Sequence, residues 1–422
     1  MSLAKEVYQS GRADEWSFMA QAWIGNPVLP LPTETIVPSD GSFRGSVLSS
    51  PPEILQLDRP IHRLMPRRDT TLAPGFFLAT LSSDWKPRVV VVARGKSVAG
   101  VVYAKERLIV GWPSGIVLVD GRWEAVVGNV VDRERLFTVA IESLFTSGVA
   151  RAVRLAIPPA GFEARAVAAA HTMLSLELTY SEIPTHQLHA CLPLLDDYDD
   201  LVQSFGPKTR RNFRYYRRRF EEAGHRYVPN VSPLMFHQAA EDLRPKCRIR
   251  STRDEVGRAV NVLASAEHPW IVGLKHRNGS WLSLAGGWYS GRRAVMFFQL
   301  NNDRDYEAAS LSIVLRGYLI ETLIRGGTRE LAFWSGTSAP LSHYATCVPA
   351  MAAHLDKRSL AWRTTRALVG KAEPWISQHV SAEMSWITGA NRLSSVPLSP
   401  PLIQDSTGPA DDSQVLFDSE RV

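Results

Sequence analysis

Residues 270–301 read WIVGLKHRNGSWLSLAGGWYSGRRAVMFFQLN, and this stretch decides the fold. Two tight-turn signals, Asn278-Gly279 and Ser290-Gly291, interrupt it. The segments between them are apolar and rich in aromatic residues: Trp270–His276, Trp281–Trp288 and Ala294–Asn301. Asn-Gly is the strongest short hairpin signal, and segments of this composition are typical of strands. The stretch therefore predicts three antiparallel strands joined by tight turns.

A helix and one more strand follow these three strands. Apolar residues recur at helical spacing from Ser310 to Arg325, and the pattern ends at Gly326-Gly327, a common way for a helix to stop. The segment Glu330–Trp334 then predicts a fourth strand. The predicted order is strand, strand, strand, helix, strand.

The same order is predicted earlier in the chain, between Arg88 and Ile157. The expected elements are strands over Arg88–Ala93, Ser97–Tyr103, Gly115–Asp120 and Trp123–Val127, a helix over Arg135–Thr146, and a strand over Ala152–Ile157. The two helices share letters: IESLF at 141–145 before Gly148 matches IETLI at 320–324 before Gly327. This match suggests an internal duplication, with chance similarity of two amphipathic helices as the alternative.

These patterns predict an α+β fold of two lobes, each with an antiparallel-rich mixed sheet flanked by helices. The expected divisions are an irregular Pro-rich arm over 1–75, a first lobe over 76–189, a second lobe over 190–355, a helical segment over 356–393 and a disordered tail over 394–422. The arm and the tail are set apart because proline is frequent in them and hydrophobic periodicity is weak.

Composition limits the class of protein. The 422 residues are 45% hydrophobic and 21% charged, enough for two domains with their own cores. Three cysteines without CxxC spacing predict neither a disulfide framework nor a metal site. No apolar run approaches the roughly 20 residues of a membrane span, and residues 1–5 lack a signal-like apolar region, so we expect a cytoplasmic protein. A net charge of +6 favours anionic partners such as CoA phosphates, nucleic acid or a membrane face.

The densest basic segment reads GPKTRRNFRYYRRRFEEAG over residues 206–224. Pro207 suits the first turn of a helix and Gly224 its end. Phe213, Tyr216 and Phe220 fall on one face, so the segment predicts a packed helix with a cationic outer surface. We expect three of its arginines to bind an anionic substrate: Arg210, Arg214 and Arg217. A merely solvated charged face is the alternative, and no RNA-recognition or zinc-finger pattern accompanies the helix.

Three motifs in this helix carry a family resemblance: RRNFR at 210–214, RRR at 217–219 and EAG at 222–224. The aromatic strands, the Ser310 helix and the segment LAFWSG at 331–336 follow in order. Over residues 190–350 the chain resembles the FemAB-related, CelD-like branch of the GNAT acyltransferase superfamily. The resemblance implies tandem GNAT-like lobes, with the chemistry in the second lobe.

The resemblance further implies transfer of an acyl group, most simply acetyl from acetyl-CoA, to an amine. The acceptor would be an envelope or exopolysaccharide precursor or another small molecule, and cell-envelope synthesis proteins would be partners. One alternative is a FemAB-type reaction with aminoacyl-tRNA as donor. Another is a non-catalytic scaffold in a polysaccharide-synthesis complex, favoured because the turn into the Ser310 helix lacks an Arg/Gln-x-x-Gly-x-Gly/Ala pyrophosphate loop.

The start of the Ser310 helix is the expected cofactor site. The first N–H groups of a helix lack partners and attract anions, so they would hold the CoA pyrophosphate. The residues concerned are Ala309, Ser310, Leu311 and Ser312. A Ser310 side chain that only caps the helix is the alternative.

Acyl transfer to an amine also needs a base for the ammonium proton and an acid for the leaving thiolate. The resemblance places Tyr344 as the acid, with an ordinary half-buried tyrosine as the alternative. The expected bases are Asp303 and His268, although a lone histidine is more often structural. Trp334 and Ser335, at the end of the last strand, are expected to bind substrate. No covalent nucleophile is expected, because WSG at 334–336 lacks the first glycine of a nucleophile elbow.

Overall fold

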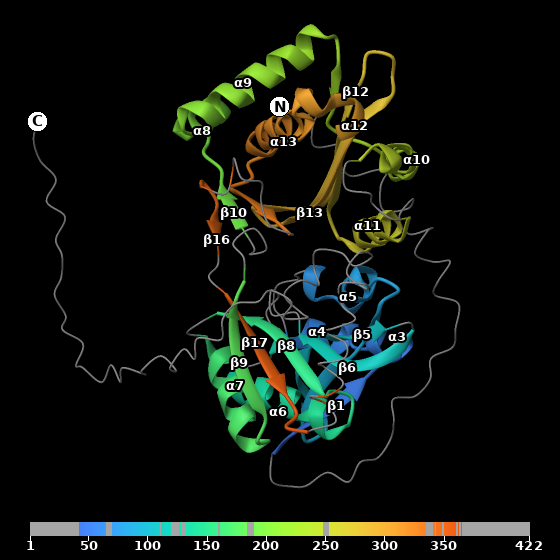
Figure 1. The fold of residues 1–422 in the computed structure, drawn as a ribbon, viewed down its shortest axis with the longest axis vertical. Coiled ribbons are helices and arrows are strands. Elements are labelled where there is room, and N and C mark those ends of the chain that lie inside the picture. The colour runs from blue at the N-terminus through green and yellow to red at the C-terminus, as the bar shows by residue number, and fades with distance from the viewer. Residues whose placement is uncertain are drawn as a thin grey trace, which may run out of the picture.

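The computed structural model describes residues 42–64, 70–109, 111–119, 126–127, 132–158, 161–183, 190–247, 253–334, 341, 343–347, 350–359, 362 and 364. These residues form two lobes that lie one above the other in Figure 1. The second lobe has one seven-stranded mixed sheet, and the first lobe has a four-stranded antiparallel sheet and a six-stranded mixed sheet. Helices cover these sheets, so the fold class is the α+β arrangement of two antiparallel-rich lobes that the sequence predicts.

The second lobe is built on a seven-stranded sheet. Its strands, in order across the sheet, are β11 (Arg226–Val228), β12 (Pro269–Lys275), β13 (Trp281–Ser290), β14 (Arg293–Asn301), β15 (Glu330–Phe333), β10 (Ala190–Pro193) and β16 (Thr346–Cys347). β12, β13 and β14 are antiparallel, and Gly279 and Gly291 take the positive φ that their turns require. α13 (Leu311–Arg325) crosses the sheet between β14 and β15, and these two strands are therefore parallel.

The first lobe repeats this order with bent strands. Its meander has three successive extended segments, and each segment is divided into two short strands. The pairs of strands are β2 (Trp85–Pro87) with β3 (Val89–Arg94), β4 (Ser97–Val102) with β5 (Ala104–Ile109), and β6 (Trp112–Val119) with β7 (Val126–Val127). Each stretch is antiparallel to the next. α6 (Arg133–Thr146) follows, and β8 (Ala152–Ile157) is parallel to β6. Strand order and helix placement thus agree with the predicted duplication.

One strand crosses from the end of the second lobe into the first. β17 (Met351–Asp356) lies between β8 and β9 (Glu177–Glu182) and is antiparallel to both. Its Ala353 and Leu355 side chains join the core of the first lobe. Residues 351–355, which we expected in the second lobe, therefore belong to the first-lobe sheet.

The later part of the Pro-rich arm is also structured. β1 (Phe43–Leu48) pairs with β3, and two short helices follow, α3 (Pro51–Leu55) and α4 (Asp58–Leu64). Pro51 and Pro52 occupy the first turn of α3, where a helix needs no N–H donor. The irregular arm expected over 1–75 is thus wrong from residue 43 onward. Residues 1–41, the tail over 394–422 and nearly all of the expected helical segment over 356–393 lie outside the described residues.

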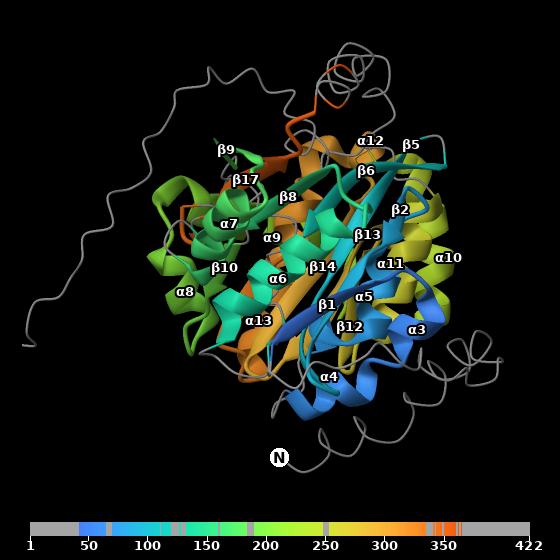
Figure 2. The same ribbon diagram turned by 90° about the horizontal axis from the view of Figure 1, so that it is seen from below.

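Helices cover both faces of the second-lobe sheet. α13 lies on one face under α8 (Tyr198–Ser204) and α9 (Pro207–Glu222), while α10 (Pro233–Leu243) and α11 (Arg253–Ser265) cover the other (Figures 1 and 2). α6 and α7 (Phe162–Met173) cover the first-lobe sheet, and α5 (Pro74–Thr80) joins the lobes by packing on α11. No helix in the described part of the chain is long and apolar enough to span a bilayer.

Candidate functional site

The edge of β14 is open at its C-terminal half. β14 pairs with β15 only over Arg293–Met296, and the Trp334 N–H adds one last bond to the Met296 carbonyl at 3.0 Å. At this point the pairing of β14 with β13 shifts and leaves Phe297 as an extra, bulged residue. Beyond it, residues 298–301 pair only with β13 among the described strands. β15 ends at Phe333, so in the described part of the chain the C-terminal half of β14 has β13 as its strand neighbour and none on the other side.

A chain of polar side chains runs along this open edge. The Arg316 Nε–H donates to Gln299 Oε1 at 3.0 Å, and Gln299 Nε2 donates to Asn301 Oδ1 at 3.1 Å. The Ser283 hydroxyl also reaches Asn301 Oδ1, at 2.6 Å, and Ser283 is fully buried. Arg316 comes from α13, whereas the other three residues come from β13 and β14. These polar side chains lie beside the apolar core that packs under α13.

Arg316 is the half-buried cation of this site. Its guanidinium stacks over the Phe333 ring at 5.6 Å, and burial lowers the pKa of Arg316 to about 10. The group therefore still carries its charge at neutral pH. Sequence reasoning missed Arg316, yet a signal was present. Nearly every residue of α13 up to 320 is apolar, and a helix that is apolar all round is buried, so its lone early charge must lie inside.

The start of α13 has an unusual backbone. Ser310 adopts a left-handed conformation with φ 47° and ψ 47°, which is uncommon for a residue with a side chain. Its carbonyl accepts the Ile313 N–H at 2.9 Å, but its side chain forms no capping bond, which disfavours the simple capping alternative. Ser312 lies one turn before Arg316 on the same face of α13. Ala309 ends the preceding 3-10 turn, and Leu311 is buried in the core.

Acidic residues precede this helix start. Asp303 and Asp305 lie in the short helix α12 (Asp303–Tyr306), where the Asn302 side chain accepts the Asp305 N–H at 3.3 Å. Asp303 is half-buried, while Asp305 and Glu307 are exposed. The predicted base Asp303 thus lies two residues beyond Asn301, at the open end of β14.

Tyr344 lies beside the start of α9. Its hydroxyl oxygen accepts the Gly206 N–H at 2.5 Å, and its ring packs against Phe205 with centroids 4.6 Å apart. Because the oxygen accepts this bond, the hydroxyl proton remains available for another acceptor. In the described part of the chain, no recorded contact joins Tyr344 to Asp303 or His268.

His268 lies at the other end of the sheet. It precedes Pro269, which pairs with Trp288, whereas Asn301 pairs with Ser283 at the far end of β13. At about 3.3 Å per residue, these two ends are separated by roughly 15–20 Å. The structure therefore does not bring the exposed His268 together with Asp303 or the start of α13.

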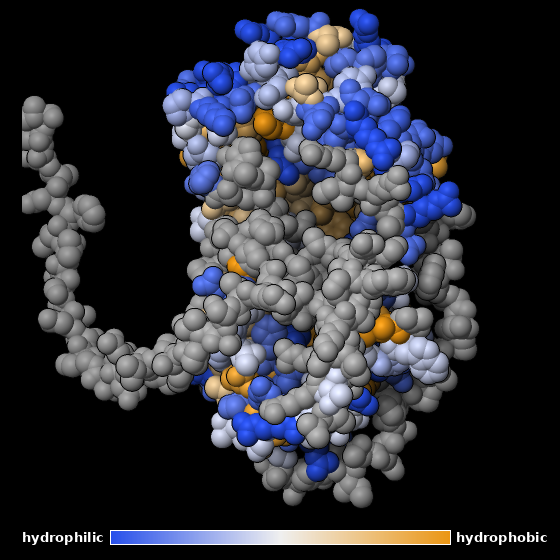
Figure 3. All heavy atoms as spheres, viewed as in Figure 1, coloured by the Kyte–Doolittle hydropathy of each residue, from blue (hydrophilic) through white to orange (hydrophobic). Residues whose placement is uncertain are grey.

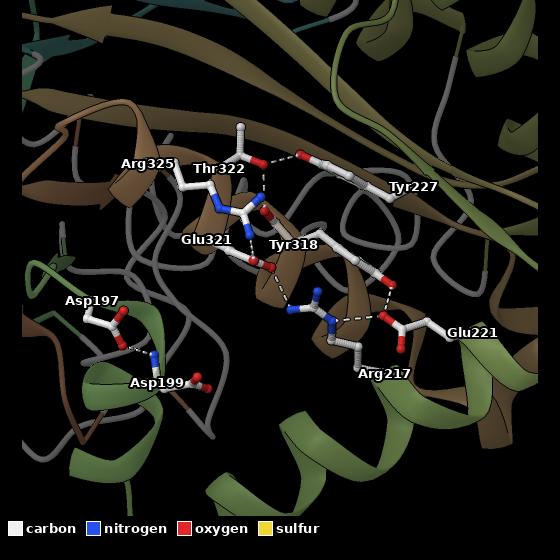
Figure 4. A network of polar contacts seen from close by, with 9 residues as sticks. All are labelled: Asp197, Asp199, Arg217, Glu221, Tyr227, Tyr318, Glu321, Thr322 and Arg325. Atoms are coloured by element: carbon white, nitrogen blue, oxygen red, sulfur yellow. Dashed lines mark hydrogen bonds and ion pairs between the residues drawn. The ribbon is translucent and has the colours of Figure 1, made fainter. Parts of the chain in front are cut away.

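The three arginines of α9 have different environments. Arg217 binds Glu221 at 3.1 Å and Glu321 at 2.6 Å, and its guanidinium stacks over Tyr318 at 4.2 Å (Figure 4). Burial alone would lower the pKa of Arg217, but the hydrogen bonds to both carboxylates outweigh it and raise the pKa. Arg210 bonds to Gln203, and Arg214 is exposed. Arg217 thus fastens α9 to α13, and anion binding by Arg210 and Arg214 stays a prediction.

Trp334 belongs to an aromatic cluster at the junction of the lobes. Its ring lies 5.3 Å from that of Trp288, 5.6 Å from Phe297 and 6.0 Å from Phe76 of α5. This packing explains the position of Trp334 without a substrate. Ser335 lies outside the described residues.

The two described thiols, those of Cys191 and Cys247, are not reactive groups. Burial, together with the nearby Glu330 carboxylate, raises the pKa of Cys191 to about 11, and burial also raises the pKa of Cys247. Both side chains are therefore neutral thiols at physiological pH, and the thiolate is the nucleophilic form. Among the described residues, no group of three or more metal-ligating side chains occurs.

Comparison with known proteins gives likenesses of fold. No protein-family model and no curated protein matches the chain. Among solved structures, FemX is 12% identical, with a TM-score of 0.47 over 71% of this chain and 95% of that one. L-PGS from Bacillus licheniformis is 10% identical, with a TM-score of 0.46 over 73% and 94%. A tandem GNAT protein from the clavulanic acid biosynthesis pathway is 12% identical, with a TM-score of 0.44 over 75% and 99%. The chain shares no more than an overall arrangement with these proteins.

Proposed function

We propose that this chain is an acyltransferase that binds its acyl donor along the open edge of β14 in the second lobe. The proposal is based on the row of hydrogen-bonded side chains from Arg316 through Gln299 to Asn301, which connects α13 with the C-terminal end of β14. The unpaired edge of a strand presents N–H and C=O groups to an extended ligand. The arm of an acyl-CoA is such a ligand, because it is linear and contains amide groups.

The charged end of the donor would lie at the start of α13. The first N–H groups of this 15-residue helix and its macrodipole favour an anion, and Ser310, Leu311 and Ser312 supply that turn. Arg316, one turn further on, adds a half-buried positive charge on the same face as Ser312. Both features favour a phosphate-bearing donor such as acetyl-CoA.

The reaction would join an acceptor amine to the acyl carbon. The C–N bond forms as the C–S bond breaks. The ammonium nitrogen loses two protons, one to the base before it attacks and one as the amide forms, and the departing thiolate takes up one proton from the acid. We propose Asp303 as the base and Tyr344 as the acid. The hydroxyl of Tyr344 is already fixed by the Gly206 N–H, which leaves its proton for the thiolate.

We propose that the acceptor is an amine of an envelope or exopolysaccharide precursor, as the CelD-like resemblance implies, and that the protein works in the cytoplasm. A second donor, aminoacyl-tRNA, is favoured by one observation. Five cations of α9 are exposed, and the molecule is hydrophilic along this helix (Figure 3): Lys208, Arg211, Arg214, Arg218 and Arg219.

Ligand-dependent stability separates these readings. A ligand at about 100 Kd adds roughly 2.7 kcal/mol to the free energy of unfolding. We expect thermal unfolding to shift upward with acetyl-CoA. An upward shift of the unfolding temperature with charged tRNA alone would favour aminoacyl-tRNA as the donor. No shift with either ligand would favour a non-catalytic scaffold.

A further inference from the structure

The hairpin formed by β5 and β6 projects from the first-lobe sheet. β2 pairs with β5 only up to Arg107, and β8 pairs with β6 only from Ile116 onward. Beyond these pairs, Leu108–Ile109 and Trp112–Pro113 pair only with each other among the described strands. At about 3.3 Å per residue, the end of the hairpin therefore extends roughly 10 Å past the start of β8.

The end of this hairpin is apolar and open to solvent. Trp112 is 77% exposed, whereas tryptophan side chains are usually well buried. Ile109 lies opposite Trp112 in the register, so the two side chains are neighbours on one face of the hairpin. Leu108 and Pro113 form the next pair along the strands. These two pairs of residues are called the hairpin tip below, and Trp112 belongs to none of the apolar cores of the described residues.

Two exposed arginines lie beside the base of the hairpin. The side chain of Arg151 lies against Gly115 of β6, and the Arg151 N–H donates to the Gly115 carbonyl at 2.8 Å. The Lys357 N–H donates to the Arg151 carbonyl at 3.0 Å, and Arg358 follows directly. Arg151 and Arg358 are both exposed. The projecting apolar tip is thus accompanied by positive charge.

Acids on the hairpin and on its neighbouring strand already have cationic partners. Asp84, which directly precedes β2, accepts from Arg107 at 3.0 Å. Glu106 of β5 is buried and accepts from Arg88 at 2.8 Å. These two carboxylates therefore do not cancel the charge of the exposed arginines. The whole chain has a net charge of +6, which acts in the same direction.

We propose that the hairpin tip binds the surface of an anionic lipid bilayer, with Trp112 in the interfacial layer and Arg151 and Arg358 beside the lipid phosphates. Tryptophan favours this layer because it combines an apolar ring system with a polar N–H. A stable protein complex buries about 800 Å² on each partner, far more than so small a tip can supply. A bilayer needs only a few apolar side chains together with positive charge. This contact does not depend on the acyl transfer proposed for the second lobe.

Sedimentation of the full chain with lipid vesicles tests the apolar part of the contact. Vesicles that contain phosphatidylglycerol should bind the wild type more tightly than vesicles of phosphatidylcholine alone. Trp112→Ala should lower the partition coefficient on the anionic vesicles by about tenfold, because a large side chain no longer enters the interface. The matched control is Leu234→Ala on α10, where Leu234 is 64% exposed on the second lobe. This control should bind as the wild type does, and neither change should lower the melting temperature.

A charge substitution tests the electrostatic part. Arg151→Gln should weaken binding to the anionic vesicles by about fivefold, the usual effect of one cation near such a surface. Added salt should reduce this difference. Arg253→Gln, at an 81% exposed side chain of α11, is the control and should leave binding unchanged.

Several results would overturn the proposal. No binding of the wild type to anionic vesicles at low salt would do so, and so would equal binding of Trp112→Ala and the wild type. Binding that is lost in Arg218→Glu but kept in Trp112→Ala would place the membrane contact on α9 instead. A dimer in analytical ultracentrifugation that Trp112→Ala dissociates, without vesicle binding, would assign the hairpin tip to a second copy of the chain.

Discussion

The two lobes share one order of strands and helix but differ at one position of the crossover helix. When the matching letters of α6 and α13 are aligned, Phe137 in the first lobe corresponds to Arg316 in the second. Phe137 is 2% exposed and packs edge-to-face on Phe162 in an apolar core. Arg316 instead begins the polar chain that leads to the open edge of β14. The same backbone arrangement therefore holds an apolar core at this position in the first lobe and the candidate functional site in the second.

Buried charge in the first lobe is satisfied within the fold. Arg154 pairs with Asp356 of β17 at 2.9 Å, and the Trp362 indole N–H donates to the same carboxylate oxygen at 2.9 Å. These contacts hold the strand that comes from the end of the second lobe. The first lobe thus uses its buried polar groups to fasten the chain, which is a structural role.

The largest effect is expected at Tyr344. If its hydroxyl is the acid, Tyr344→Phe lowers kcat by roughly 10²- to 10⁴-fold while donor affinity stays close to that of the wild type. Loss of the bond from Gly206 should cost about 1 kcal/mol of stability. Tyr180→Phe, in β9 of the first lobe, is the matched control and should leave turnover unchanged. Steady-state kinetics with acetyl-CoA measures both, and normal turnover of Tyr344→Phe would remove the acid role.

Two phenylalanines test the separation of core and site. Phe137 and Phe213 are both buried, so each change to Ala should cost about 3 to 5 kcal/mol of stability. Only Phe213 packs near Gly317 of α13, so only Phe213→Ala should also weaken donor affinity in the folded protein. Denaturant unfolding measures the loss of stability, and calorimetric titration measures the donor affinity. Equal loss of affinity in both variants would contradict the assignment of the site to one lobe.

The Arg217 network predicts a pH dependence at the second lobe. The hydrogen bond from the Tyr318 hydroxyl and that from Arg217 lower the pKa of Glu221 below its ordinary 4.5. A carboxyl whose folded-state pKa is depressed stabilises the fold above its unfolded pKa, and this stability is lost as the pH falls through the folded value. The melting temperature should therefore fall more steeply below about pH 4.5 in the wild type than in Glu221→Gln.

A first-lobe substitution controls for general acid effects. Glu134 forms a surface pair with Arg165 at 2.6 Å, and both side chains are widely exposed. Because exposed pairs contribute little, Glu134→Gln should follow the wild-type melting curve over the same pH range. Identical curves for all three proteins would show that the network does not couple to stability.

The smallest effect is expected on the outer surface of α9. Changing Arg214 to Glu should weaken binding of an anionic donor by no more than about fivefold, and added salt should remove the difference. Lys96→Glu, at an exposed turn of the first lobe, should have no such effect. Donor affinity measured at low and at high salt distinguishes the Arg214→Glu and Lys96→Glu variants. Equal affinity in Arg214→Glu and wild type would leave α9 with a packing role only.

Local signals in the sequence were sufficient to predict the two meanders and their helices. Asn278-Gly279 and the shared letters at 141–145 and 320–324 are short-range patterns, and the structure has the elements where these patterns predict them. β17 could not be predicted in place, because Met351–Asp356 pairs with strands about 170 to 200 residues away in sequence. β1 was missed because the flanking prolines suggested an irregular arm.

The site was predicted less well than the fold. The helix start at Ser310 and the predicted base Asp303 lie near the C-terminal end of β14, but His268 does not, since antiparallel strands place it at the other end of the sheet. Gln299, Asn301 and Ser283 look like ordinary strand residues in sequence. Only the register of β13 and β14 against α13 brings them together with Arg316.

The central claim is that Arg316, and not its counterpart Phe137, makes the lobe a donor site. The most direct test compares Arg316→Met with Phe137→Met by thermal unfolding, with and without acetyl-CoA. We predict that Arg316→Met remains folded but loses the stabilisation of roughly 2.7 kcal/mol that acetyl-CoA at about 100 Kd gives the wild type. Phe137→Met should keep it. An undiminished shift in Arg316→Met, or an equal loss in Phe137→Met, would contradict the account.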